Sequence, residues 1–270
     1  MKVAGNIRKM RSTLEDVVHY ELPLYSILEP NHYIPLNPLL GQRIRLSFEN
    51  EIHCVVTGKK IKKAFGEGMS YDAFMNSPQA SPSIIRPELS RIHEGIALRD
   101  FDWEMEHHMQ PHFVYFSNTS GIKVGVTRTT QVPTRWIDQG AIQAIIVAET
   151  PYRQAAGLIE VALKPYLADK TNWQQMLKAD ADILNLLQEK QHYVNFLPED
   201  LKQWIQKDSK ETLIKYPILN YPLKVKSLKL DTNPEIEGIL TGIKGQYLML
   251  DSLNVVNIRS HAGYRISLEY

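Results

Sequence analysis

The sequence predicts an α+β protein in which a central three-stranded antiparallel sheet with helices is flanked by N- and C-terminal β segments. Residues 112–163 read as two apolar strands, a short helix, a third apolar strand and a helix with apolar residues at helical spacing. Residues 42–56 and 216–270 contain stretches that alternate between apolar and polar residues, as half-buried strands do. Because chain ends often lie close together, the two flanking regions are candidates to pair into a small barrel.

Shifts in composition divide the chain into five expected segments. These are an N-terminal β region (1–56), an irregular insert (57–111), the αβ core (112–170), a helical segment (171–212) and a C-terminal β region (213–270). The insert is rich in Gly, Pro and Lys and has no long periodic element. A stretch of this length needs a reason, such as a metal clip, a lid or disorder. Within the first region, Asn50 is expected to turn the chain into a second strand at 51–56.

The bulk composition excludes several classes of site. The chain has 270 residues, a net charge of +1 and one cysteine, Cys54. Intramolecular disulfides and a Cys-rich zinc site are therefore excluded, and no zinc is expected. Nucleic-acid binding would need a local basic patch, because there is no global excess of positive charge. No signal peptide or membrane-spanning stretch is visible, so we expect a cytoplasmic protein without a membrane partner. The sequence leaves the oligomeric state open.

The core carries four residues in an order that matters for chemistry. Tyr115 lies in the strand FVYFS, Gly125 near the end of the strand IKVGVT, Arg135 at the start of a helix that follows Pro133, and Glu160 in the middle of the last helix. This order resembles the GIY-YIG endonucleases over residues 113–163. The resemblance implies a metal-dependent phosphodiester hydrolase that acts on nucleic acid, DNA or RNA. Its sheet would be the three-stranded antiparallel sheet predicted above.

The resemblance also implies a role for each residue. Tyr115 would be the general base, Arg135 would stabilise the phosphate charge, and Glu160 would bind Mg²⁺ or Mn²⁺. These roles fit the residue types, because an arginine fork matches phosphate oxygens and one carboxylate with waters can hold Mg²⁺. Lys123 and Arg128 would position the phosphate, and Gly125 would let the backbone approach it closely. No acidic residue falls between 121 and 135, which predicts a phosphate-facing patch of Lys123, Arg128 and Arg135.

Two residues depart from the GIY-YIG pattern. Lys123 stands where many of these enzymes have a second tyrosine, and Gln139 stands where several have a histidine. Two other functions therefore stay open. One is a nucleic-acid-binding module without catalysis, in which GIKGQYLMLD and its neighbours bind the nucleic-acid backbone. The other is a structural or regulatory protein that keeps the fold and has discarded the site.

A second resemblance covers nearly the whole chain. The stretches SGIKVGVTRTTQVPTRWIDQGA, DKTNW and GIKGQYLMLD followed by NIR are similar to an uncharacterised bacterial family of unknown function. The resemblance implies a cysteine-rich insert in relatives, of a kind that suits zinc. Cys54 survives here, and the insert is expected to fold without metal or to be loose. The other ligand positions carry different residues: Thr57, Ser70, Ala73, Ala80, Ser83, Ser90 and His108.

Structural explanations compete with each functional one. Tyr115 can be a packing residue of its strand, and Glu160 can point outward into water. Trp136 and Trp173 are expected in the core rather than as stacking platforms for bases. Adjacent histidines on an irregular loop are more often exposed than metal-bound. The histidines in question are His107, His108 and His112. A lysine cluster is either a solvated turn or a nucleic-acid contact, and it consists of Lys59, Lys60, Lys62 and Lys63.

Overall fold

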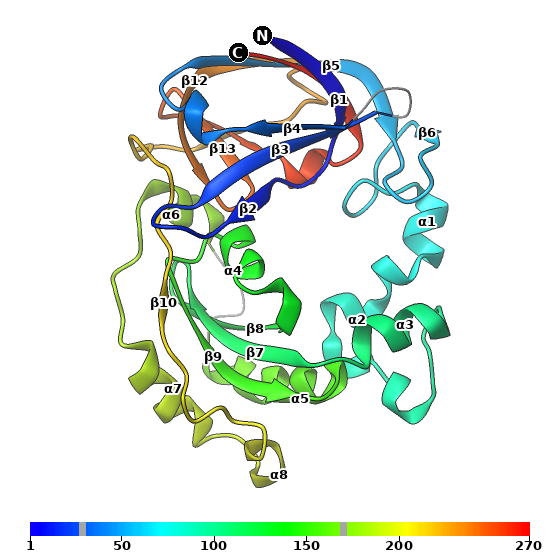
Figure 1. Ribbon diagram of the computed structural model, residues 1–270, viewed down its shortest axis with the longest axis vertical. Coiled ribbons are helices and arrows are strands. Elements are labelled where there is room, and N and C mark those ends of the chain that lie inside the picture. Colours follow the sequence, from blue (N-terminus) through cyan, green and yellow to red (C-terminus); the bar gives the residue numbers. More distant parts are fainter. Residues whose placement is uncertain (27–30, 168–171) are drawn as a thin grey trace. The chain divides into compact units, whose positions relative to one another are not determined.

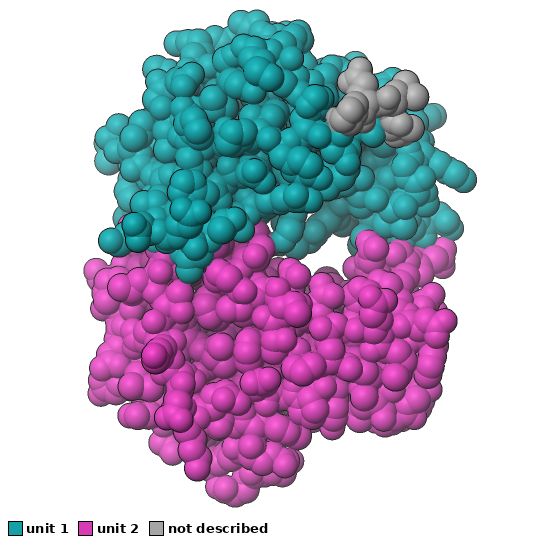
Figure 2. Space-filling model, in the orientation of Figure 1, with its two compact units in different colours: residues 1–74, 177–179, 215–270 teal, residues 75–176, 180–214 magenta. Residues whose placement is uncertain are grey.

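The structure is a computed structural model that describes residues 1–26, 31–167 and 172–270 (Figure 1). It confirms the mixed α+β class. The chain forms two compact units, the first from Met1–Phe74, Leu177–Ala179 and Lys215–Tyr270, and the second from Met75–Met176 and Asp180–Ile214 (Figure 2). The five segments expected from the sequence are thus grouped into two units. The first three residues of DKTNW, 169–171, lie outside the described residues.

The first unit is built on an eleven-stranded sheet. Along its path the strands follow the order β11-β14-β13-β12-β5-β15-β1-β3-β2, with β4 beside β3 and β6 beside β5. The strands are β1 (Lys2–Ile7), β2 (Arg11–Thr13), β3 (His19–Tyr25), β4 (His32–Pro35), β5 (Arg43–His53), β6 (Lys60–Ile61), β11 (Lys226–Leu228), β12 (Glu235–Lys244), β13 (Tyr247–Leu250), β14 (Asn254–Asn257) and β15 (Tyr264–Glu269).

The two ends of the chain meet in this sheet. Strand β1 pairs antiparallel with β15, with Lys2 opposite Glu269, and β5 lies between β15 and β12. The prediction that the N- and C-terminal β regions pair is therefore confirmed. The sheet stays open between β11 and β2, so the described strands do not form the small barrel that the sequence suggested.

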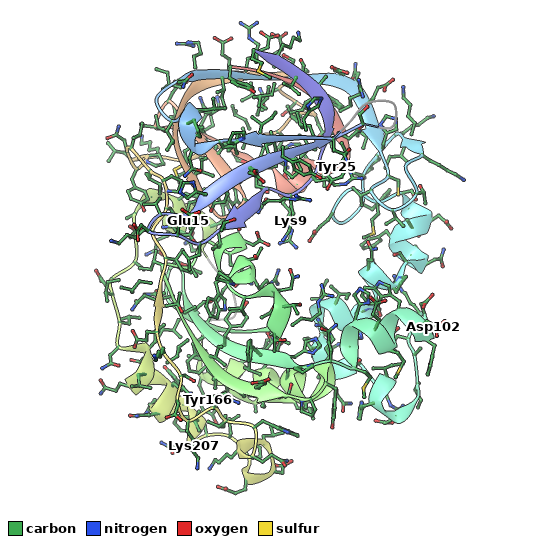
Figure 3. The ribbon with its side chains drawn as sticks, viewed as in Figure 1. Lys9, Glu15, Tyr25, Asp102, Tyr166 and Lys207 are labelled. Atoms are coloured by element: carbon green, nitrogen blue, oxygen red, sulfur yellow. The ribbon has the colours of Figure 1, made fainter. Side chains whose placement is uncertain are left out.

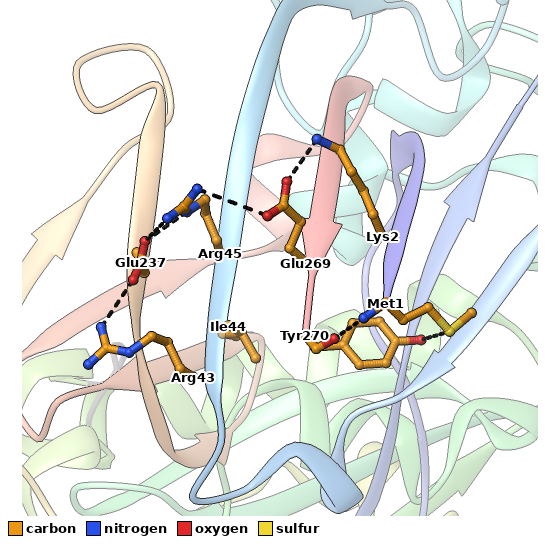
Figure 4. A pocket seen from close by; sticks show the side chains of 8 residues that line it. All are labelled: Met1, Lys2, Arg43, Ile44, Arg45, Glu237, Glu269 and Tyr270. Carbon is orange, nitrogen blue, oxygen red and sulfur yellow. Dashed lines mark hydrogen bonds and ion pairs between the residues drawn. The ribbon is translucent and has the colours of Figure 1, made fainter.

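A ladder of opposite charges crosses four neighbouring strands of this sheet (Figure 4). Lys2 lies 2.8 Å from Glu269, and Glu237 lies 2.6 Å from Arg45 and 3.1 Å from Arg43. These side chains line a surface hollow of about 510 Å³. Each charge in it has an opposite neighbour, and exposed pairs of this kind contribute little stability. The charged side chains that line the hollow therefore neutralise one another.

Asn50 does not turn the chain as the sequence suggested. Strand β5 runs through it without a break, and Asn50 takes a left-handed φ of 60°. The register against β15 shifts there, because Tyr264 pairs with Ile52 while Ile266 pairs with Phe48. Asn50 therefore forms a β-bulge in one long strand, a position that asparagine tolerates better than most residues. The predicted turn into a second strand is wrong.

The second unit contains an antiparallel sheet in the order β10-β9-β7-β8. Its strands are β7 (His112–Asn118), β8 (Ile122–Arg128), β9 (Gln143–Thr150) and β10 (Thr212–Leu213). Helix α4 (Thr134–Asp138) joins β8 to β9, and helix α5 (Arg153–Leu163) follows β9. The strands and helices predicted between 112 and 163 are confirmed. Helix α5 stops before Pro165, which lies in a 3₁₀ turn, Lys164–Tyr166.

The two helices cover different faces of this sheet (Figure 1). Side chains alternate between the faces of a strand, so Val114 and Phe116 share one face of β7 and Tyr115 takes the other. The first face packs against Ala156, Ile159 and Leu163 of α5 in a buried core. Tyr115 instead meets Trp136 of α4, with ring centroids 6.0 Å apart. Trp136 is buried, as expected of a core residue.

The insert folds into short helices instead of one periodic element. Asp100 caps the longest of them by accepting a hydrogen bond from the backbone of Trp103, and Asp102 projects from the same helix (Figure 3). The segment after the core is also a series of short helices. The helices of both segments are α1 (Tyr71–Asn76), α2 (Pro82–Ile85), α3 (Phe101–His108), α6 (Trp173–Lys178), α7 (Leu186–Val194) and α8 (Glu199–Lys202). The 3₁₀ turns not yet given are η1 (Asn37–Leu39), η2 (Pro78–Ala80), η3 (Pro87–Leu89), η4 (Ile92–Glu94), η5 (Thr129–Gln131) and η7 (Arg259–His261).

A glycine fixes the insert against helix α5. A Cβ atom added to Gly157 would overlap the backbone nitrogen of Glu88 and would lie 2.6 Å from the carbonyl carbon of Pro87. Only a residue without a side chain lets the backbone of η3 approach the helix this closely. The contact brings Glu88 beside the polar flank of α5.

We expect Gly157→Ala to destabilise the protein by roughly 1–3 kcal/mol, because the added methyl group must displace backbone. Helix propensity alone predicts a gain of about 1 kcal/mol, so the sign separates the two effects. Urea unfolding measures the difference. The neighbouring Leu158→Ala is the control, because Leu158 is 42% exposed on the same helix. A Gly157→Ala protein as stable as the wild type would contradict the close contact.

Candidate functional site

Tyr115 lies in the middle of the central strand of the second sheet and is fully buried. Its hydroxyl donates a hydrogen bond to Oε1 of Gln139, 3.1 Å away at the C-terminal end of α4. Burial raises the pKa of the phenol, while the charge of Arg135 and hydrogen bonds with Arg135 and Gln139 lower it, and the net pKa lies above the ordinary value. The phenol is therefore neutral in this state.

Gly125 makes room for this phenol. It lies directly opposite Tyr115 on the neighbouring strand β8. A Cβ atom at position 125 would lie 2.6 Å from the Tyr115 hydroxyl and 2.7 Å from the ring. The sequence suggested that Gly125 lets backbone approach a ligand. In the structure the space above Gly125 holds the Tyr115 ring, which gives the glycine a packing reason.

Arg135 reaches the same phenol from helix α4. Pro133 takes the N-cap position of the helix, and Gly140 follows its end with a φ of 72°, as the sequence pattern of a proline start and a glycine stop indicates. One turn separates Arg135 from Gln139, so both side chains lie on the helix face above Tyr115. Gln139, noted in the sequence only as a departure, therefore contributes a hydrogen-bond partner to the phenol.

Glu160 lies on the flank of α5 beside the apolar face. One stripe along α5 consists of residues spaced four, three and four positions apart: Arg153, Gly157, Glu160 and Lys164. Glu160 is 8% exposed, and Lys164 lies 3.5 Å from its Oε2 atom. It is buried rather than pointing outward among Gln154, Lys164 and water, although Lys164 is its partner. Its charge slightly raises the pKa of the Tyr115 phenol.

The environment of Glu160 contains a carboxylate that the sequence analysis missed. Burial raises the pKa of Glu160, Lys164 lowers it, and the charge of Glu88 raises it again, so that the pKa lies above the ordinary value. The Oε1 atom of Glu88 pairs with Arg86 at 2.9 Å. The Oε2 atoms of Glu88 and Glu160 are both buried without a hydrogen-bond partner. No local pattern could reveal this pair, because the contact at Gly157 creates it.

The pleat of the sheet divides the predicted phosphate-facing patch. Lys123 pairs with Ser117 and shares the Tyr115 face, whereas Arg128 pairs with His112 and shares the α5 face. Lys123 can therefore serve the Tyr115 face with Arg135. Arg128 belongs to a different group of side chains.

That group contains Arg153 and His112, which the sequence analysis did not assign to the site. Burial lowers the pKa of Arg153 to about 10, against the favourable charge of Glu160, and the nearby charges of Arg135 and Arg128 lower it further. Burial also lowers the pKa of His112 to about 4, although its hydrogen bond to Gln110 opposes the shift, and Arg153 and Arg128 lower it further. A basic residue at the start of a helix opposes the helix dipole, and this was the available signal for Arg153.

The histidines differ from the exposed residues that the sequence suggested. His108 and His112 are buried, and the Nε2 atom of each lacks a hydrogen-bond partner among the described residues. His107 stacks on Trp103, with ring centroids 4.0 Å apart. Burial lowers the pKa of His108 to about 3. In the part of the chain that the structure describes, no group of three or more His, Cys, Asp or Glu residues is placed to hold a metal ion.

Several insert residues singled out by the family resemblance lie at two places. Around Cys54, the backbone of Ser70 donates to the sulfur at 3.2 Å and the backbone of Ala73 donates to the Ser70 hydroxyl at 3.1 Å. Burial opposes ionisation of Cys54, but hydrogen bonds from Thr57, Ser70 and the adjoining backbone lower its pKa to about 6. In the second unit, the Ser90 hydroxyl lies 3.2 Å from Nδ1 of His108.

The remaining sequence candidates have ordinary partners. Lys60 of the lysine cluster pairs with Glu51, and Lys63 lies over the ring of Phe65. Within the described ranges, none of the helices combines the length and the apolar character that crossing a bilayer requires.

Comparison with known proteins identifies a family but no activity. The model of the family described as "Protein of unknown function (DUF2797)" matches residues 41–266. No curated protein and no solved structure matches the chain.

The buried histidines predict loss of stability in acid. His112 has a pKa of about 4 in the folded protein, below the ordinary histidine value of 6.5, so the unfolded chain binds a proton more readily. The stabilisation is complete above pH 6.5 and is lost as the pH falls towards 4. From pH 7 to pH 5 we expect His112 to account for about 2 kcal/mol of lost stability, measured by urea unfolding.

His112→Asn should flatten this pH dependence, because the asparagine amide can still donate to the Gln110 carbonyl that the His112 ring contacts at 2.7 Å. His19→Asn is the control, since the His19 side chain is 55% exposed. If both variants keep the wild-type slope between pH 7 and pH 5, His112 is not buried in its neutral form.

Proposed function

The chain belongs to the DUF2797 family, whose description gives no activity, and we propose that it is a metal-dependent phosphodiester hydrolase of GIY-YIG type that acts on nucleic acid. One observation carries the proposal. The buried phenol of Tyr115 interacts with the guanidinium of Arg135 and lies within the field of the Glu160 carboxylate. These side chains come from β7, α4 and α5, in the order that the GIY-YIG resemblance requires.

Arg135 supplies positive charge where phosphodiester cleavage develops negative charge. It has no carboxylate partner within ion-pair distance among the described residues. Its planar fork can therefore meet two phosphate oxygens at once, which a lysine cannot do. A positive charge that is already in position stabilises the transition state with little rearrangement of the surrounding protein during the reaction.

Glu160 fits the single carboxylate that the GIY-YIG type requires for Mg²⁺ or Mn²⁺. Its buried Oε2 atom has the Lys164 ammonium as its neighbour at 3.5 Å, and a cation would take the place of that ammonium. Mg²⁺ keeps several waters and is commonly held by one or two carboxylates together with phosphate oxygens. When bound, the ion would neutralise charge on the leaving oxygen. Glu160 would hold it, and Lys164 would give up its present contact.

Tyr115 holds a proton that must leave before the phenol can act as a base. That proton is donated to Gln139 Oε1 in this structure. Arg135 favours its loss, because a guanidinium next to the oxygen stabilises the phenolate. Burial opposes its loss. The hydrogen bond to Gln139 fixes the direction of the hydroxyl, and the phenol oxygen can accept a hydrogen bond from Arg135.

Nucleic acid is the substrate class that the local charge favours. The chain as a whole carries a net charge of +1, but Arg128, Arg135 and Arg153 act on one another electrostatically around one end of the second sheet. Lys123 adds a positive side chain on the Tyr115 face. Local positive charge of this kind attracts phosphate backbones without regard to sequence.

A second function is favoured by a different observation. The Tyr115 side chain is fully enclosed and its pKa is raised, as suits a packing residue. A nucleic-acid-binding module that keeps this arrangement without catalysis would show the same features. It would bind nucleic acid with strong salt dependence and would cleave none.

The test of hydrolysis incubates the full chain with plasmid DNA, single-stranded DNA and RNA, each in Mg²⁺ and in Mn²⁺. We expect cleavage that falls about 100-fold or more in Arg135→Gln and Glu160→Gln, because each removes a charge that acts on the reacting phosphate. Tyr115→Phe should lower the rate constant while leaving binding intact.

Arg91→Gln and Glu94→Gln are matched controls, since these two residues form an exposed ion pair with each other. Their rates should equal that of the wild type. Cleavage that persists undiminished in Arg135→Gln and Glu160→Gln would rule out the proposed site. Salt-sensitive binding without cleavage would establish the non-catalytic function, and the absence of both would leave a structural role.

A further inference from the structure

We propose that Arg128 and Arg153, with the imidazole of His112 beside them, form a second phosphate-binding subsite on the α5 face of the sheet. Arg128 and His112 lie on the opposite face of the sheet from Tyr115, although the charge of Arg135 also acts on Arg153. The subsite would hold a phosphate that is not the one being hydrolysed. The assignment of that phosphate to a nucleic-acid chain rests on the function proposed above, whereas binding of free inorganic phosphate does not.

The strand register brings the three side chains together. His112 opens β7, and it pairs with Arg128 at the end of β8 on one side and with Thr150 at the end of β9 on the other. The hydroxyl of Thr150 donates to the His112 carbonyl at 3.3 Å. Arg153 follows Thr150 as the first residue of α5, so it begins at the same end of the sheet.

The positive charge at this end of the sheet has no balancing carboxylate. Neither Arg128 nor Arg153 has an acidic ion-pair partner among the described residues. Glu160 is the one carboxylate whose charge is felt by Arg153, and Lys164 already pairs with it. The first turn of α5 adds the positive end of a helix dipole, and the side chain of Tyr152 does not cap it. An anion would offset this charge.

Arg153 is held with part of its guanidinium available. Its Nε donates to the carbonyl of Ser83 and its Nη2 to the carbonyl of Ile84, both at 2.9 Å. These bonds use two of the five N–H donors and fix the plane of the fork. The other three have no hydrogen-bond partner in the described part of the chain. A fixed fork with free donors suits the oxygens of a phosphate.

His112 gives an independent sign of a missing partner. The ring is fully buried, its Nδ1 atom lies 2.7 Å from the Gln110 carbonyl, and its Nε2 atom is buried without a hydrogen-bond partner. Buried polar atoms are nearly always paired, so an orphan of this kind needs an explanation. The charges that act on the His112 ring are those of Arg128 of β8 and Arg153 of α5. His108 of α3 lies nearby and has the buried Glu104 as its carboxylate neighbour, 4.0 Å from its Nδ1 atom.

Phosphate is the ligand class that these groups recognise. Two guanidinium forks match its tetrahedral oxygens, and an imidazole can donate to a third oxygen once it is protonated. A carboxylate ligand would use one fork only. A neighbouring phosphate bound here would position a nucleic-acid chain while the scissile phosphate lies at Arg135.

The experiment follows His112 by NMR of its ring in the full chain, without metal ions and with EDTA present. Inorganic phosphate is titrated against the protein, and sodium chloride of equal ionic strength serves as the reference. We expect a saturable shift of the His112 resonance, and a rise of its pKa from about 4 by about one unit, because a nearby anion favours the imidazolium. His112→Asn identifies the resonance among the nine histidines.

Two variants test the arginines. Arg128→Gln and Arg153→Gln should each raise the Kd for phosphate about tenfold or more, since each removes charge-assisted hydrogen bonds. Arg91→Gln should leave the Kd within about twofold of the wild type, because the exposed Arg91 belongs to a separate ion pair. Arg153 also anchors backbone, so Arg128→Gln decides the outcome if Arg153→Gln does not fold.

Two results would overturn the subsite. One is a His112 shift that chloride reproduces or that does not saturate. The other is a Kd that Arg128→Gln leaves unchanged. A protein that cleaves nucleic acid normally but shows either result lacks the subsite and keeps the proposed function. A protein that binds phosphate as described but cleaves nothing keeps the subsite and lacks the hydrolase activity.

Discussion

The packing of the Tyr115 phenol over Gly125 is the contact on which the candidate site depends. Because Gly125 has no Cβ atom, the ring can lie flat against β8 and its hydroxyl can reach Gln139 on α4. A larger residue at 125 would push the phenol towards α4 and change its position relative to Arg135. One hydrogen atom in place of a methyl group therefore sets the geometry of the phenol, the guanidinium and the carboxylate together.

The electrostatic balance around this contact supports the proposal of an anionic ligand. Burying charged groups is costly unless they are paired, and Arg128, Arg135 and Arg153 have no carboxylate partners among the described residues. The nearest carboxylate, Glu160, is shared with Lys164 and is itself opposed by Glu88. Burial is the main cause of the lowered pKa of both His112 and Arg153, and the neighbouring positive charges lower each pKa further. A phosphate group would offset this positive charge on either face of the sheet.

The sequence predicted the local structure of the core that holds the candidate residues. Apolar strands and helix signals placed Tyr115, Arg135 and Glu160 on the elements that hold them, because these features depend on short-range patterns. Asn50 was misread, since a bulge and a turn use the same residue types and only the pairing with β15 separates them. Arg153 and Glu88 were missed, because their surroundings arise from contacts between the insert and α5. The division of Lys123 from Arg128 follows from the pleat, and a count of charges along the chain does not reveal it.

The insert is connected to the site through backbone rather than through side-chain chemistry. Two carbonyl groups, of Ser83 and Ile84, receive the donors of Arg153, and the backbone of η3 lies against Gly157. Backbone contacts do not depend on which side chains occupy the neighbouring positions. The orientation of Arg153 therefore does not depend on which side chains occupy the other positions of the insert. For this reason a change in how the insert is stabilised need not alter the charge presented by α5, provided that the insert still folds against the helix.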